Sequence, residues 1–182
     1  TMPRLVLDPR YLGLSVLAAL FSLTMTIFEI ALPLSLSLRS HFPGWLFGAS
    51  LAANALLVLL FQQRLAANAG TLSSARRAVA MSAVCLAGGC LALALNDTNT
   101  KAPAAVVLCG VALLTAGEML ESAGFWTISH AMASPARRAE YLAAFDMGFP
   151  LLRVAGPPLA AWIGVMGAAG WIVGATIFVA GG

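Results

Sequence analysis

Long apolar segments separated by short polar breaks make up almost the whole chain. A helix needs about 20 apolar residues, each adding about 1.5 Å, to cross the hydrocarbon core of a bilayer. Five segments meet this length and a sixth is shorter. Together they cover residues 11–38, 44–62, 75–95, 103–128, 141–164 and 167–182. The pattern predicts an all-α, polytopic membrane protein, in which residues 1–182 form one bundle of six transmembrane helices.

Turn-forming residues occupy the breaks between these segments. Asp8-Pro9 can cap and start the first helix, because a proline at the first helical position loses no hydrogen bond. The stretches 41–44, 96–99 and 134–135 are rich in proline, glycine and short polar side chains, and they predict reversals of the chain. No segment is polar and long enough to be a soluble domain.

The composition agrees with a lipid-embedded chain. Hydrophobic residues make up 60% of the sequence and charged residues only 9%, against about 25% in soluble domains. The net charge of +3 forms no basic stripe, because the arginines lie in short breaks between apolar segments, and we expect no nucleic-acid partner. The three cysteines fall inside apolar segments, so we expect no disulfide framework and no metal site.

The arginines predict the orientation of the bundle. Alternate breaks carry them, and the richer side holds Arg4, Arg10, Arg64, Arg76, Arg77, Arg137 and Arg138. Only Arg39 and Lys101 lie on the other side. Because cytoplasmic loops of membrane proteins are enriched in Lys and Arg, we expect both chain ends in the cytoplasm and the helices in the plasma membrane.

Five charged residues lie well inside the apolar segments, away from their ends, namely Glu29, Glu118, Glu121, Asp146 and Arg153. Each costs about 2.5 kcal/mol or more at the centre of a bilayer, so each is a candidate for substrate binding or proton coupling. They fall on the first, fourth and fifth segments. We therefore expect these three helices to line a polar interior and the third and sixth to face lipid.

Helical spacing adds neighbours to these charges. Glu118 and Glu121 share a helix face that Phe125 continues. A second stripe at i, i+3, i+4 and i+7 holds Asp146, Phe149, Pro150 and Arg153. Phe125, Phe149 and Pro150 are therefore candidate cavity-lining residues. Kinks are expected near the charges, because Pro33, Pro150, Pro157 and Pro158 lie inside predicted helices.

Two interpretations of these charges stay open. Glu118 and Arg153 both lie about 22 Å from the cytoplasmic ends of antiparallel helices, so they could form an ion pair that fixes helix register. They could instead handle substrate or protons, because a carboxylic acid in an apolar cavity can exchange protons near neutral pH. Asp146 could likewise pair with Arg137 or Arg138 near the membrane surface.

Several short motifs follow one another in a recognisable order. They are Leu7–Tyr11, Ala31–Leu34, Ala116–Leu120, Arg138–Tyr141 and Gly156-Pro157. In this succession the chain resembles the C-terminal half of the major facilitator superfamily, in particular bacterial drug-efflux-like members. The stretch Ala116–Leu120 is similar to the glycine–glutamate motif of that half, whereas residues 64–77 only loosely resemble its gating loop.

This resemblance implies a secondary transporter that moves small organic molecules by alternating access. It implies that no cofactor is needed and that a proton gradient drives the transport. The partner is either a missing N-terminal six-helix half or a second copy. An alternative is a six-helix protein that acts only as an assembled subunit with a separate half. An intramembrane enzyme is less favoured, because no Gly-x-Ser-Gly or His-Glu-x-x-His motif is present.

Overall fold

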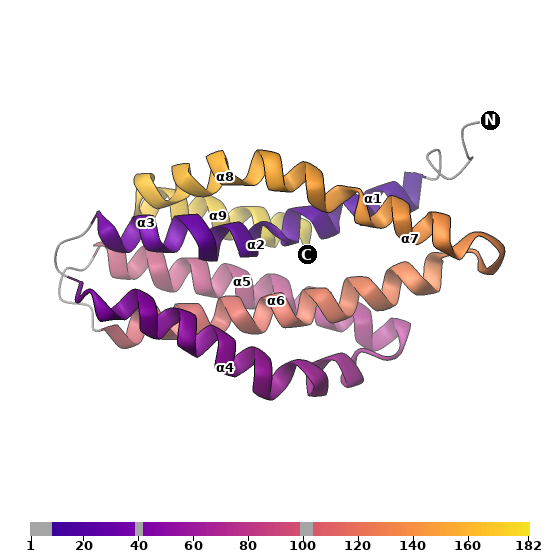
Figure 1. Cartoon of the computed structure of the whole chain (residues 1–182), viewed down its shortest axis with the longest axis horizontal. Helices are drawn as coiled ribbons and strands as arrows, with labels where there is room; N and C mark the ends of the chain where they lie inside the picture. Colours follow the sequence, from indigo (N-terminus) through magenta and orange to yellow (C-terminus); the bar gives the residue numbers. More distant parts are fainter. Residues whose placement is uncertain (1–8, 39–41, 99–103) are drawn as a thin grey trace.

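A computed structural model describes residues 9–38, 42–98 and 104–182 (Figure 1). Every regular element in these ranges is helical, so the predicted all-α class is confirmed. The elements are α1 (Pro9–Phe21), α2 (Leu23–Thr26), the π-helix η2 (Ile27–Ala31), α3 (Leu32–Ser37), α4 (Trp45–Asn68), α5 (Leu72–Thr98), α6 (Ala104–Met132), the 3₁₀ helix η3 (Pro135–Arg137), α7 (Arg138–Asp146), α8 (Gly148–Met166) and α9 (Ala168–Gly181).

Each predicted apolar segment coincides with one helix or one interrupted helical run. Within the described ranges, five helical segments are long and apolar enough to cross a membrane, and α9, with 14 residues, is shorter. The largest difference in bounds is at the end of α4, which continues to Asn68 instead of ending at Gln62. The outer surface is strongly apolar, since Leu59, Val84 and Val154 are more than 70% exposed. The structure is therefore an all-helical bundle compatible with a membrane protein.

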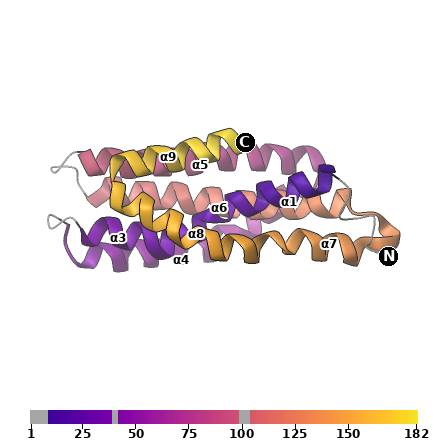
Figure 2. The same cartoon turned by 90° about the horizontal axis from the view of Figure 1, so that it is seen from above.

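The helices run side by side along the long axis of the molecule (Figures 1 and 2). The α4–α5 and α6–α7 connections lie at the same end as the start of α1, and the α8–α9 turn lies at the other end. Arg10, Arg64, Arg76 and Arg138 therefore gather at one end of the bundle. Arg4, Arg39 and Lys101 lie outside the described residues. The assignment of the arginine-rich end to the cytoplasm stays a prediction.

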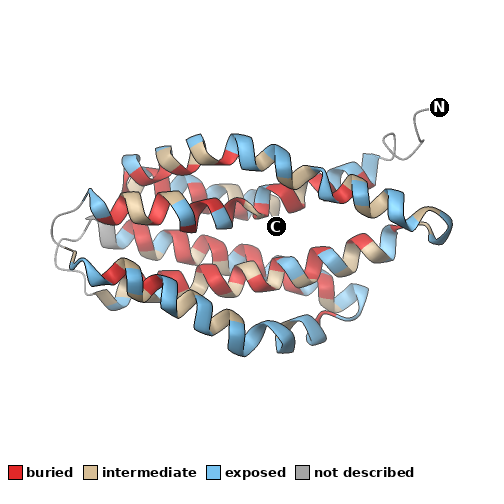
Figure 3. Cartoon of the chain, viewed as in Figure 1, coloured by how far each residue is buried: buried red, intermediate tan, exposed pale blue. Residues whose placement is uncertain are grey.

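The position of the third helix differs from the sequence expectation. In α5, 56% of the residues in the apolar segment are buried, against 11% in α4 (Figure 3). The helix packs mainly against α6 and α9, while α4 packs on the outside of α6. Only one edge of α5, which includes Met81, Val84 and Leu91, is exposed. The second helix is thus more exposed than the third.

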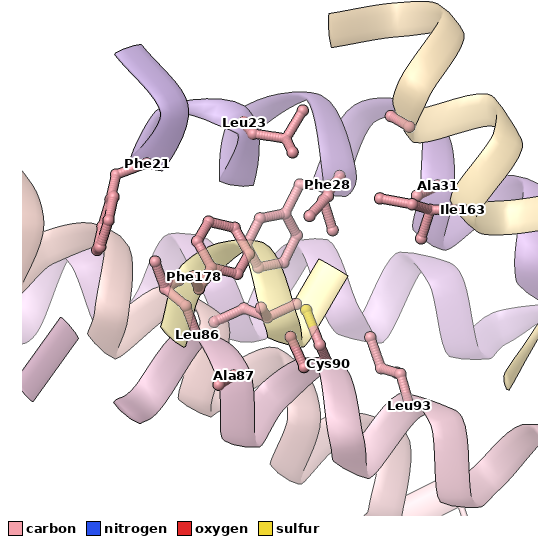
Figure 4. Close-up of a cluster of buried hydrophobic side chains, with 14 of the residues drawn as sticks. Phe21, Leu23, Phe28, Ala31, Leu86, Ala87, Cys90, Leu93, Ile163 and Phe178 are labelled. Carbon is pink, nitrogen blue, oxygen red and sulfur yellow. The ribbon is translucent and has the colours of Figure 1, made fainter. Parts of the chain in front are cut away.

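The core lies between α5, α9 and the first helical run (Figure 4). Phe21 is its central aromatic residue, because its ring packs edge-on against Phe125 of α6 at 5.4 Å and Phe178 of α9 at 5.8 Å between ring centroids. Leu86 and Cys90 of α5 complete the contact and are fully buried. This cluster joins four helical segments and fixes one wall of the region described next.

Two of the helical runs are interrupted where prolines predict it. The first run breaks after Phe21 and passes through η2 before Pro33, which has no N–H to donate to the Glu29 carbonyl. The fifth run breaks at Met147, and Pro150 cannot donate to the Asp146 carbonyl. Pro157 and Pro158, by contrast, lie inside α8 without ending it.

Candidate functional site

Two adjoining pockets open between the first, fourth and fifth helical runs. The first, here the acidic pocket, has a volume of about 260 Å³ and is lined by Ala18, Ser22, Met25, Glu118, Glu121, Ser122, Phe125, Trp126, Phe145, Asp146 and Phe149. The second, here the mixed pocket, has a volume of about 660 Å³ and is lined by Ser22, Met25, Thr26, Glu29, Phe149, Leu152, Arg153 and Pro157. Ser22, Met25 and Phe149 line both, so the two pockets adjoin each other along these side chains.

The five ionisable residues singled out from the sequence all line this pair of pockets. Glu118, Glu121 and Asp146 line the acidic pocket. Glu29 and Arg153 line the mixed pocket. The structure therefore gathers charges from three helical runs into one region, although they are up to 124 positions apart in the sequence (153 − 29 = 124).

The predicted cavity-lining residues are only partly recovered. Phe125 lines the acidic pocket and Phe149 lines both pockets. Pro150 lines neither of them and is exposed in the first turn of α8. The role of Pro150 in a cavity stays a prediction, and its missing N–H leaves the Asp146 carbonyl without that helical donor.

The predicted ion pair between Glu118 and Arg153 does not form. The two side chains line different pockets, and no ion pair joins them in the described part of the chain. An equal predicted depth does not fix the direction in which a helix presents a side chain. The structural interpretation of this pair is therefore not supported.

Asp146 also lacks the partner considered for it. Arg137 instead binds Glu140, one turn away, and its Nε donates to the Glu140 Oε2 at 3.0 Å. Across residues 9–38, 42–98 and 104–182, no side-chain hydrogen bond or ion pair is formed by Glu29, Glu118, Glu121, Asp146 or Arg153. These five side chains are thus available to a ligand or to protons.

Burial differs sharply among the carboxylates. Glu121 is only 7% exposed, and Glu118, three residues earlier on the same face, is half-buried. Glu29 and Asp146 are exposed at the open side of their pockets. A charged group entering from the open side would therefore meet Asp146 or Glu29 first and Glu121 last.

Aromatic side chains form much of the acidic pocket. Phe145 and Phe149 lie edge-on to each other with ring centroids 5.5 Å apart. Phe125 is buried, and Trp126 is 54% exposed, with its ring 4.6 Å from that of His130. Aromatic faces attract cations and apolar rings alike, so this lining can hold an organic molecule beside the carboxylates.

Two lining residues that the sequence reasoning missed are Ser22 and Met25. They lie at positions i and i+3 of a face that Glu29 continues at i+7, so helical spacing around Glu29 could have found them. The π-helix at residues 27–31 was also missed, although Pro33 is the local signal for it. Such π-helical turns occur often at functional sites.

Within the described residues, no group of three or more His, Cys, Asp or Glu side chains is arranged to hold a metal ion.

Comparison with known proteins identifies no relative. The chain matches no protein-family model, no curated protein sequence and no solved structure at a significant level.

Proposed function

We propose that this chain is half of a secondary active transporter that moves small organic molecules across the plasma membrane, coupled to protons. The observation that carries the proposal is the pair of adjoining pockets between apolar helices, which is lined by all five of the charged residues singled out from the sequence. A charge inside a membrane segment is costly and is usually kept for binding or transport. Here none of the five is used by a hydrogen bond or ion pair within the described residues.

The carboxylates supply the proposed coupling chemistry. Glu118 and Glu121 are three residues apart and line one pocket, so protonation of one reduces the repulsion felt by the other. An incoming substrate and a proton can then compete for the same group. This exchange is the elementary step of a proton-coupled transporter.

The interrupted helices support movement around the site. Glu29 lies inside the π-helix η2, and Asp146 is the last residue of α7, directly before the break at Met147. Helix interruptions beside a binding site are a common feature of secondary transporters, whose two halves rock around a central site. Both interruptions adjoin a pocket, which favours alternating access over a purely structural role for the bundle.

The open side of the mixed pocket favours a second six-helix unit. Its lining comes only from the first and fifth helical runs, so one bundle encloses it on one side. We propose that the pocket is closed either by an N-terminal half similar to that of the major facilitator superfamily or by a second copy. Light scattering of the purified chain separates the two, since a second copy doubles the mass of 18.8 kDa.

A reconstitution experiment tests the transport proposal. Proteoliposomes containing the chain and enclosing a pH-sensitive dye are given benzyltrimethylammonium, phenylmethanesulfonate or benzyl alcohol, and proton movement is recorded. We expect at least one compound to move protons. Glu118→Gln is expected to reduce that flux by roughly tenfold or more, since a proton-transferring group commonly contributes at least this factor.

The matched control is Glu140→Gln, which removes an exposed carboxylate outside both pockets. It should leave the flux unchanged. Normal flux in Glu118→Gln would contradict the coupling role of Glu118. If Glu118→Gln instead failed to give a folded, monodisperse protein, the carboxylate would have a structural role. Absence of flux with all three compounds would contradict transport by copies of this chain alone and favour the subunit that needs a separate half.

A further inference from the structure

Glu121 is a buried carboxylate with no partner of its own. It is 7% exposed, lines the acidic pocket, and makes no hydrogen bond or ion pair in the described part of the chain. A buried charge without a partner is unfavourable by several kcal/mol in proteins. A ligand that brings a positive charge into the pocket would remove this cost.

The charge of the pocket has one sign. Three carboxylates line it, from Glu118, Glu121 and Asp146, and no Lys, Arg or His is among its lining residues. The mixed pocket adds Glu29 and Arg153, whose opposite charges cancel. With all five groups ionised, the two pockets together carry four negative charges and one positive, a net charge of −3. This field favours a cation over a neutral or anionic ligand.

Aromatic rings stand beside the carboxylates. Phe125, Trp126, Phe145 and Phe149 line the same pocket, and the last two are in edge-on contact. A cation over an aromatic face is attracted by the electrons of the ring, most strongly over tryptophan. The volume of about 260 Å³ suits a single ring with a charged group, and the rest of a longer molecule can extend past Phe149 into the mixed pocket.

We infer that the acidic pocket is a binding site for the aromatic, positively charged end of an organic cation, with Glu121 as the innermost counter-charge. Asp146, at the exposed side, meets the cation first, and Trp126 covers it from the rim. The inference rests on the proposed function, because it takes this pocket as the substrate site. Binding can nevertheless be measured without transport.

Equilibrium dialysis of the purified full chain in an uncharged detergent tests the inference. The probe is benzyltrimethylammonium. It is compared with neopentylbenzene, its uncharged carbon isostere, and with phenylmethanesulfonate, which carries the opposite charge on the same ring. The cation should bind at least roughly tenfold more tightly than either of the other two, the factor expected from one charge-assisted contact of about 1.4 kcal/mol.

Variants assign the binding to the pocket. Glu121→Gln and Asp146→Asn should each weaken binding of the cation by roughly fivefold or more, and Trp126→Leu by roughly threefold. The matched control, Glu140→Gln, should bind as the unsubstituted chain does. Asp146 and Trp126 are exposed, so their variants keep the test valid if Glu121→Gln does not fold.

Equal binding of the cation and its uncharged isostere would overturn the inference. Binding of the cation that none of the three pocket variants weakens would also overturn it. Cation binding with the expected variant effects, but without proton movement in proteoliposomes, would uphold the site and contradict the proposed transport. Proton movement driven by phenylmethanesulfonate or benzyl alcohol, without cation binding, would uphold transport and overturn the cation site.

Discussion

Gly164 of α8 lies so close to Ala31 that a Cβ atom at position 164 would come within 2.8 Å of the Ala31 carbonyl oxygen. The same helix approaches Thr26 at Gly156 and Ser15 at Gly148, where a Cβ would lie 3.0 Å from each neighbour. The fifth helical run therefore contacts the first at three levels through glycines. Because the mixed pocket is lined only by these two runs, their spacing sets its width.

This contact predicts the effect of Gly164→Ala. The added methyl group collides with backbone that cannot move without shifting η2, so we expect a loss of about 1–3 kcal/mol in stability. The measurement is the temperature at which the detergent-solubilised chain loses its monodisperse elution peak. Gly48→Ala in α4 is the control, because nothing lies within 4 Å of its Cβ position. An equal melting temperature for Gly164→Ala and the unsubstituted chain would contradict the close contact.

The break between α7 and α8 carries a second prediction. Pro150→Ala supplies an N–H that can donate to the Asp146 carbonyl, so we expect α7 and α8 to join into one helix. Hydrogen exchange of the amides at residues 146–150 should slow, and proton flux in proteoliposomes should fall if the break is needed for movement. Pro158→Ala is the control, since α8 is continuous at that position. Fast exchange at residues 146–150 in Pro150→Ala would show that another contact causes the break.

The helices themselves could be predicted from the sequence because hydropathy depends on local composition. Six apolar segments had to be helical in lipid, where every backbone polar group needs a partner within the chain. The interruptions near Glu29 and Asp146 also had local signals, in Pro33 and Pro150. These features depend on residues within a few positions of each other, so no tertiary information was needed.

The direction of each side chain could not be obtained in the same way. Glu118 and Arg153 have the same predicted depth, but packing sets the rotation of α6 and α8 about their axes, and the two side chains line different pockets. The enclosed position of α5 could not be predicted from the charges either. Glycines, and not charges, allow α5 to pack closely against α6, because a Cβ at Gly89 would lie 2.8 Å from the Gly110 carbonyl oxygen of α6.

Arg153 provides a prediction about the charge of the two pockets. Among the lining residues of the two pockets, Arg153 is the basic one. It lines the mixed pocket, which adjoins the acidic pocket at Phe149. Arg153→Met removes the repulsion between this arginine and a bound cation. Binding of benzyltrimethylammonium in dialysis should therefore strengthen by roughly threefold or more. This factor is the one expected for two unit charges about 10 Å apart in a medium of intermediate dielectric constant. Arg138→Met, exposed outside the pockets, is the control. Weaker binding in Arg153→Met would mean that Arg153 holds the pocket open or contacts the ligand.

The orientation of the bundle gives the last prediction, and cysteine labelling tests it. Ser73 lies near the start of α5, at the arginine-rich end, whereas Gly44 precedes α4 at the opposite end, and both positions are exposed. In a background with Cys85, Cys90 and Cys109 replaced by alanine, Gly44→Cys should react with a membrane-impermeant maleimide in intact cells. Ser73→Cys should react only after the membrane is permeabilised, because the arginine-rich end is expected to face the cytoplasm. The reverse pattern would place the arginines outside and invert the proposed direction of the pockets. Labelling of both positions in intact cells would mean that the helices do not separate the two ends across a membrane.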